Sequence, residues 1–224
     1  MSEIIKNIPF TIDIGQLEKE LMLNNQDDKK KLRAMVGEAE EIALPQAIYR
    51  ESYLKKKTDN YLIIGNYKFE SKILCRNIGS HNRVFLYAVT VGNELDQWAG
   101  EKEELLESYW AGQIQEKVLK TAVSYLYNIL NKLIGSECSS EMNPGSLPDW
   151  PITEQEKLFA LLGNVEGDIG LKLTDSFLML PAKSVSGIKF PSETDFKNCQ
   201  LCQRENCPTR RVPYDPEKLT DILH

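Results

Sequence analysis

The fold of this chain is decided by a loop that reads Asn143-Pro144-Gly145-Ser146-Leu147-Pro148-Asp149-Trp150-Pro151. Three prolines and one glycine in nine residues fix backbone angles and remove amide donors, so neither a helix nor a strand can absorb this stretch. It lies inside about 18 residues, 135–152, without helical or strand periodicity, and loops of that length are usually functional or disordered. The stiff proline-glycine core favours function, and we expect a surface loop of one definite shape.

A short helix is predicted directly after this loop. Thr153 and Glu156 have the spacing of a capping box, and the apolar residues that follow end at Gly163. Farther along, residues 184–187 read Ser-Val-Ser-Gly, which predicts either a strand that ends at a glycine or a structural turn. A stiff loop that leads into a helix N-terminus is well placed to hold a ligand.

The motifs of this region resemble those of the activation domain of cobalamin-dependent methionine synthase, which binds S-adenosylmethionine. They are the Pro-Gly loop with Asp-Trp-Pro, the Gln-x-x-Leu-Phe-x-Leu-Leu helix at 155–162, and the Ser-x-x-Met-x-Pro-x-x-Ser-Val-Ser-Gly segment at 176–187. The likeness is greatest to the stand-alone form that some bacteria encode as a separate chain. It covers the C-terminal half, whereas the N-terminal half agrees only in the order of its elements.

The resemblance implies a fold and a function. The fold is a single α+β domain with a twisted, mostly antiparallel sheet, a long buried helix and a side cleft. We place an activation-domain-like unit at residues 1–190 and a cysteine-rich tail at 191–224. The function is that of a reactivation partner of a cobalamin-dependent methyltransferase, supporting reductive methylation of cob(II)alamin with S-adenosylmethionine as methyl donor.

Such a chain is a component of a methyltransferase system rather than a self-sufficient enzyme. The resemblance implies two partners, a corrinoid-binding methyltransferase or methionine synthase chain and a flavodoxin- or ferredoxin-type reductant. The protein's task is positional, so no catalytic acid or base is required. The residues expected to bind the cofactors are Glu116, Pro144, Gly145, Ser146, Asp149, Ser184, Val185, Ser186 and Gly187.

Two positions depart from the family's loop motif. The family has an arginine four residues before the loop glycine and a tyrosine directly after it, whereas this chain has Glu141 and Ser146. An arginine suits a forked contact with the methionyl carboxylate, and a glutamate repels that group. These changes favour an alternative function, in which the chain is a non-catalytic scaffold that binds corrinoid proteins and has lost the ability to bind S-adenosylmethionine.

The tail carries three cysteines in a C-x2-C-x4-C pattern, Cys199, Cys202 and Cys207. Three thiols in so short a segment predict a zinc or iron–sulfur site, and nearby arginines favour the thiolate forms. A cluster would support a third hypothesis, an electron carrier to the corrinoid. The fourth ligand is left open among Cys75, Cys138, His224 and solvent.

The composition sets the broad class. With 224 residues, 42% of them hydrophobic, the chain is long enough to bury a full core. Its net charge of −6 has acids and bases intermixed, which argues against a nucleic-acid partner. No apolar run of membrane-spanning length and no basic-then-apolar leader is seen, so we expect a cytoplasmic location and no membrane partner.

Periodicity supplies the remaining elements. The Lys55–Lys57 run is expected to be a solvated loop. A long helix at 108–134 has so wide an apolar arc that we expect it to be buried on most sides. The other predictions are an edge strand at 8–14, an amphipathic segment at 17–23, a helix from Asp27 to Pro45, strands at 61–64 and 83–91, and a helix at 69–78.

Overall fold

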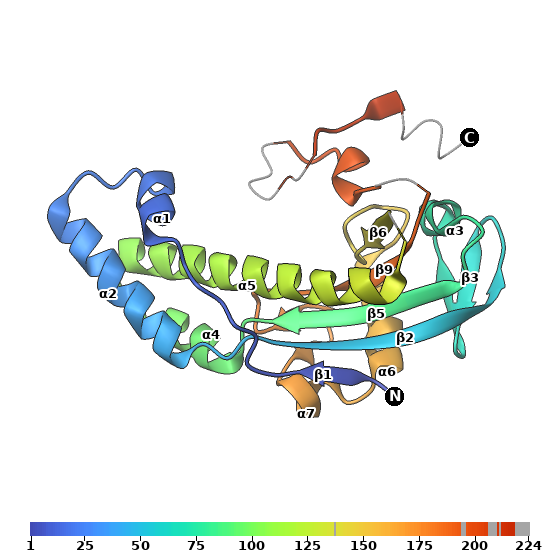
Figure 1. Cartoon of the computed structure of the whole chain (residues 1–224), viewed down its shortest axis with the longest axis horizontal. Coiled ribbons are helices and arrows are strands. Elements are labelled where there is room, and N and C mark those ends of the chain that lie inside the picture. Colours follow the sequence, from blue (N-terminus) through green and yellow to red (C-terminus); the bar gives the residue numbers. More distant parts are fainter. Residues whose placement is uncertain (137, 194–195, 206–209, 211, 218–224) are drawn as a thin grey trace.

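An antiparallel sheet forms the centre of the molecule, seen in the computed structural model (Figure 1). The structure describes residues 1–136, 138–193, 196–205, 210 and 212–217. Within them the sheet has seven strands in the order β4-β3-β2-β5-β9-β6, with β1 paired to β2. These strands are β1 (Glu3–Ile5), β2 (Gln46–Lys57), β3 (Tyr61–Ile64), β4 (Tyr67–Glu70), β5 (Arg83–Thr90), β6 (Ser139–Met142) and β9 (Ser184–Pro191).

Both faces of the central strand β5 are covered by helices. Phe85, Tyr87 and Val89 face the long helix α5 (Leu105–Ile134), while Leu86 and Ala88 face the opposite layer. Because successive side chains of a strand point to opposite faces, a strand buried on both sides is apolar at nearly every position. The opposite layer consists of α3 (Lys72–Ile78), α6 (Gln155–Leu162) and α7 (Val165–Ile169). The mixed helical and antiparallel architecture predicted from the sequence is confirmed.

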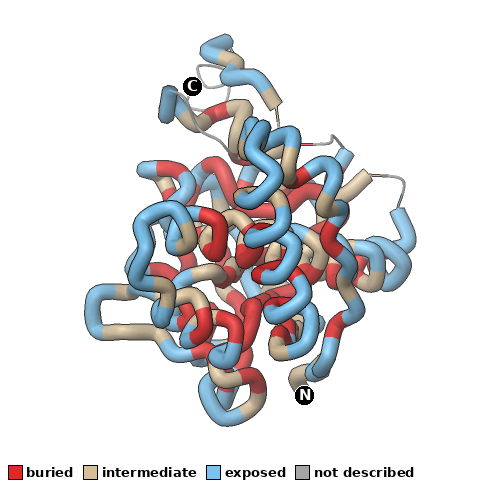
Figure 2. The backbone as a smooth tube through the Cα atoms, turned by 90° about the vertical axis from the view of Figure 1, so that its left-hand side faces the viewer, coloured by how far each residue is buried: buried red, intermediate tan, exposed pale blue. Residues whose placement is uncertain are grey.

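A second core lies beyond the end of the sheet. It is built by α1 (Ile14–Glu20), α2 (Gln26–Ile42), α4 (Asn93–Gly100) and the first half of α5. Trp98 donates a hydrogen bond to Glu38 across this core at 2.9 Å. Figure 2, a view from this end of the molecule, shows buried backbone in the centre with exposed segments around it.

Several predicted elements differ from the structure. Residues 8–14 are no edge strand, because Ile8 is buried beside the sheet and Ile12 in the helical core, so the segment bridges the two cores instead of pairing. Lys55–Lys57 extend β2 with exposed side chains and are not a loop. Phe69 and Glu70, predicted as the start of a helix, belong to β4, which pairs with β3.

Two helix predictions also need correction. The helix α5 buries one face only, and Tyr125 and Leu133 on the other side are 38% and 40% exposed. The capping box of Thr153 and Glu156 does not form, because a short 3-10 turn, Ile152–Glu154, precedes α6 and Glu154 takes the cap position. The end of α6 at Gly163 is confirmed. None of the helices in the described part of the chain is long and apolar enough to cross a bilayer.

Candidate functional site

The proline-glycine loop has a defined shape that its own backbone holds. Gly145 N donates to Trp150 O at 2.8 Å, and Trp150 N donates to Leu147 O at 3.0 Å. Trp150 is fully buried and packs edge-on against Phe69, with ring centroids 6.4 Å apart. Gly145 has a φ of +80°, a conformation that glycine adopts without strain. The loop therefore anchors two apolar side chains in the core and leaves Gly145 and Ser146 exposed.

Asp149, a predicted ligand residue, caps a helix in this structure. Its carboxylate accepts hydrogen bonds from Ile73 N at 3.0 Å, from Lys72 N at 3.3 Å and from the Ser71 hydroxyl. The free amides of a first helical turn favour a negative partner, so Asp149 ties the loop to the start of α3. A ligand contact by Asp149 stays a prediction, and any such contact must share the carboxylate with α3.

Asn143 organises the start of the loop, although no sequence signal marks it as functional. Its side-chain Nδ2 donates to Tyr87 Oη at 2.9 Å and to the carbonyl oxygen of Ser186 at 2.8 Å. Tyr87 Oη in turn lies 2.6 Å from Tyr127 Oη on α5. Asn143 thus connects the loop to β9, to β5 and, through the two tyrosines, to α5.

Gly187 gives Asn143 the space that it occupies. A Cβ atom at Gly187 would lie 2.6 Å from Asn143 Nδ2, 2.6 Å from Met142 O and 2.8 Å from Tyr87 Oη. The space that a side chain would take at Gly187 is therefore occupied by other atoms of the protein. The Ser-Val-Ser-Gly sequence needs its glycine for this close approach, whether or not a ligand lies nearby.

The other predicted residues of this segment belong to β9. Val185 pairs with Val89 and packs on the α5 side, whereas Ser184 and Ser186 face the opposite layer. Ser184 Oγ donates to Pro181 O at 2.7 Å, while Ser186 Oγ is buried without a hydrogen-bond partner among the described residues. The segment is a strand, as one of the two predictions had it, but the strand continues through Gly187 to Pro191 and does not end at the glycine. Its serines do not line an open surface.

Glu116 lies near the start of β9. Its carboxylate is 3.6 Å from Lys183 Nζ, and both side chains are about one-third exposed. Since β9 rises about 3.3 Å per residue, Ser184 and Gly187 are about 10 Å apart along the strand. The predicted residues are thus arranged along the first half of β9, with Glu116 at one end and the loop at the other.

Glu141, which stands where the family motif has arginine, does not offer its charge to solvent. Its carboxylate lies 3.7 Å from Lys189 Nζ, and the two residues are only 4% and 3% exposed. The Lys189 ammonium also lies 4.6 Å from the centre of the Tyr127 ring. Removing one member of a buried pair leaves an unpaired charge, so Glu141 and Lys189 depend on each other.

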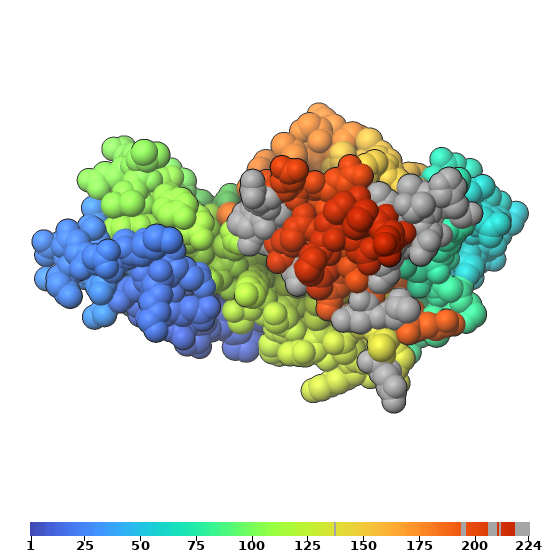
Figure 3. All heavy atoms as spheres, turned by 90° about the horizontal axis from the view of Figure 1, so that it is seen from above, coloured from blue at the N-terminus to red at the C-terminus, as the bar shows by residue number. Residues whose placement is uncertain are grey.

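The C-terminal segment packs on the same region. Phe196 and Leu201 are buried in the core cluster that also contains residues of α3 and α6, and a short 3-10 turn, Asn198–Gln200, connects them. Phe196 N donates to Ser140 Oγ at 3.1 Å. Figure 3 shows this segment, in red, as a raised cover between α5 and the loop region that follows β6.

The structure describes two of the three cysteines that were predicted as metal ligands. Cys199 and Cys202 are half-buried, and Arg210 donates to both of their carbonyl oxygens, at 3.0 and 3.2 Å. Cys207 and His224 lie outside the described residues. Among the residues that are described, no three His, Cys, Asp or Glu side chains come together as a metal site.

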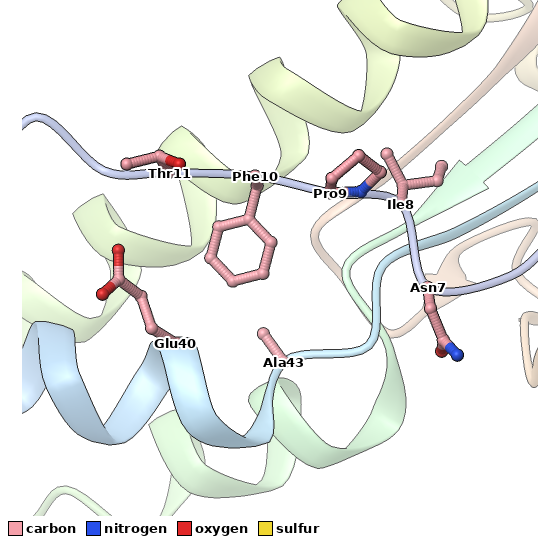
Figure 4. A pocket seen from close by; sticks show the side chains of 7 residues that line it. All are labelled: Asn7, Ile8, Pro9, Phe10, Thr11, Glu40 and Ala43. Atoms are coloured by element: carbon pink, nitrogen blue, oxygen red, sulfur yellow. The ribbon is translucent and has the colours of Figure 1, made fainter.

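Two surface cavities lie away from the residues predicted to bind the cofactors. One, of about 420 Å³, is formed by the bridging segment Asn7–Thr11 together with Glu40 and Ala43 of α2 and its end (Figure 4). The other, of about 490 Å³, lies between Gln200 and residues 212–217. Figure 4 shows the Phe10 ring pointing into the first cavity and Glu40 at its margin.

Comparisons with known proteins give two matches that concern one kind of domain. A sequence model of the family described as "Vitamin B12 dependent methionine synthase, activation domain" matches residues 144–208. A solved structure described as the MetH reactivation domain bound to AdoHcy matches with a TM-score of 0.63 and 18% identity, covering 88% of this chain and 80% of that one. Sequence and fold both resemble the methionine synthase activation domain. No curated protein sequence matches the chain.

The activation-domain match falls on the parts that the sequence singled out. It begins at Pro144 in the loop, includes β9 and extends to residue 208 in the C-terminal segment. The fold match covers the N-terminal half as well, where the sequence offered no motif. The predicted cofactor-binding roles of individual residues remain predictions.

Proposed function

We propose that this chain is a reactivation partner of a cobalamin-dependent methyltransferase, with S-adenosylmethionine as its methyl donor. The observation that carries the proposal is the activation-domain match over residues 144–208, because this range contains both the loop and β9. The fold likeness to a reactivation domain bound to AdoHcy supports the same conclusion. The corrinoid belongs to a separate partner chain.

The candidate site fits a positional task. Its polar groups are held rigidly, by Asn143 at the loop and by Asp149 at α3. S-adenosylmethionine supplies an activated methyl group, and the reduction of cobalt requires an electron from a flavodoxin- or ferredoxin-type donor. Fixing a methyl donor in a near-attack position accelerates transfer without an acid or base on the protein.

Binding should be measured by titration calorimetry of the whole chain with S-adenosylmethionine and with S-adenosylhomocysteine. We expect saturable binding of both, in a one-to-one ratio. A coupled assay should then follow the return of activity of an inactivated corrinoid methyltransferase in the presence of this chain, the methyl donor and a reductant. Absence of any binding, together with no reactivation, would refute the proposal.

One observation favours a second candidate, a corrinoid-binding scaffold without a methyl donor. The loop 143–151 has no cationic side chain, and Lys189 is committed to Glu141. A methionyl carboxylate therefore meets no unpaired cation in the loop itself. The scaffold hypothesis predicts that the chain co-purifies with a cobamide-carrying protein while calorimetry with S-adenosylmethionine gives no heat.

A further inference from the structure

The side-chain amide of Asn143 has one orientation that satisfies its neighbours. The carbonyl oxygen of Ser186, 2.8 Å away, can only accept a hydrogen bond, so the Asn143 nitrogen must face it. The Asn143 oxygen then faces the C-terminal segment. There Asn198 lies with its Nδ2 at 3.4 Å and donates to that oxygen.

This arrangement also fixes the Asn198 amide. Because its nitrogen faces Asn143, its oxygen points elsewhere, and Asn198 Oδ1 has no hydrogen-bond partner among the described residues. Asn198 is only 4% exposed, so bulk solvent does not supply the missing hydrogen bond. A buried acceptor without a partner costs about 1–3 kcal/mol, and such groups are rare enough in native structures to require a reason.

Asn198 cannot simply turn outwards. Phe196 and Leu201 on either side of it are 1% and 2% exposed, and Leu201 N donates to Asn198 O at 3.0 Å. The backbone of the preceding residue, Lys197, forms a parallel bridge with Glu141 of β6. The unsatisfied oxygen is therefore held at the entrance to the proline-glycine loop.

We propose that Asn198 is a ligand-binding residue whose side-chain oxygen accepts a hydrogen bond from an N–H group of the bound ligand. The proposal rests on the function proposed above and adds the C-terminal segment to that site. Since Oδ1 is shielded in this structure, the ligand enters before the segment closes over the loop. S-adenosylmethionine has two groups of this kind, the ammonium of its methionyl part and the amine of its adenine.

The test compares Asn198→Leu with the wild-type chain in calorimetry and in thermal unfolding. Leucine keeps the branching of the side chain at Cγ, and it removes both the unsatisfied oxygen and the hydrogen bond to Asn143, so we expect a melting temperature close to that of the wild type. The affinity for S-adenosylmethionine should fall about ten- to a hundredfold, the usual effect of losing a hydrogen bond to a charged or polar ligand group. Gln203→Leu, on the same segment and exposed, is the matched control and should leave affinity unchanged.

Two fragments of the ligand identify the donor group. 5′-Methylthioadenosine carries the adenine amine without the ammonium, and L-methionine carries only the ammonium. The fragment whose binding weakens in Asn198→Leu contains the donor.

Unchanged affinity in Asn198→Leu overturns the inference and leaves the proposed function standing. A lowered melting temperature with unchanged affinity assigns Asn198 a purely structural role. If the wild-type chain binds none of the three compounds, the inference falls; if it also restores no activity to an inactivated corrinoid methyltransferase, the proposed function falls with it.

Discussion

Replacing Gly187 with alanine should destabilise the domain because the protein already fills the position of the new methyl group. A Cβ atom there lies 2.6 Å from Asn143 Nδ2, 2.6 Å from Met142 O and 2.8 Å from Tyr87 Oη. One of these atoms belongs to the backbone of β6, so the side chains alone cannot relieve the contact. Forcing extra atoms into a packed site costs about 1–3 kcal/mol.

Displacement of Asn143 adds to that cost. Its two hydrogen bonds, to Ser186 O and Tyr87 Oη, each contribute about 1 kcal/mol. The two effects together give an expected loss of about 3–5 kcal/mol. For a chain of this length each kcal/mol lowers the melting temperature by about 2–4 °C, which gives a fall of about 6–20 °C.

Thermal unfolding followed by circular dichroism measures this change, and Gly112→Ala provides the control. Gly112 lies in α5 with no atom within 4 Å of its Cβ position, so alanine there should be neutral or stabilise by up to about 1 kcal/mol. Adding Asn143→Ala to Gly187→Ala should recover part of the loss, while the contact with Met142 O persists. A Gly187→Ala protein with the same melting temperature as the wild type would refute this account of the loop.

Three further predictions concern other parts of the chain. Asp149→Ala should lower the free energy of unfolding, measured in urea, by about 1–2 kcal/mol. Asp149→Asn should lower it by less, because the asparagine oxygen still caps α3. Equal losses in the two variants would contradict the capping role of the oxygen at position 149. Burial raises the pKa of the Cys75 thiol from 9.0 to about 11, so the unfolded chain ionises first. The wild type should therefore lose up to about 3 kcal/mol relative to Cys75→Ala as the pH rises from 9 to 11, with no relative change below pH 9. Anaerobically purified protein should contain zinc or an iron–sulfur cluster, and metal analysis of Cys199→Ser and Cys202→Ser should show its loss; metal-free wild-type protein would remove the electron-carrier hypothesis.

Elements whose pattern depends on local sequence were predictable. The strand Tyr61–Ile64 has the predicted bounds, and β5 ends one residue before its predicted end. Both are short runs of β-branched and aromatic residues bounded by turn residues, a signal that needs no distant partner. The rigidity of the loop was likewise predictable, since proline and glycine act on their own backbone.

Elements that depend on distant partners were not predictable. The strand β6 reads Ser-Ser-Glu-Met, which is polar, yet it is largely buried because Ser140 pairs with Ser192 and Glu141 with Lys189. These partners lie about 50 residues away and become visible only in the folded chain. The strand β2 was missed for a related reason, because five of its 12 residues are exposed and the strand is defined by its pairing with β5.

The candidate site divides in the same way. The sequence motif located the loop and β9, and the fold brings both to one region together with Glu116. The roles of Asn143 and Asn198 could not be foreseen, since each depends on contacts with residues that are at least 43 positions away in the sequence. An asparagine before a proline also reads simply as a turn residue.

The helix α5 belongs to two cores at once. Ile114 and Val118 are buried in the helical core, and one turn later Ala122 and Leu126 are buried against the sheet. Calorimetry should therefore record a single melting event, with the distal tip and the sheet giving way together. A minimal fragment of the chain has to keep α5 intact. A cut between residues 118 and 122 would leave two halves, each with an exposed apolar surface that the missing part of α5 no longer covers.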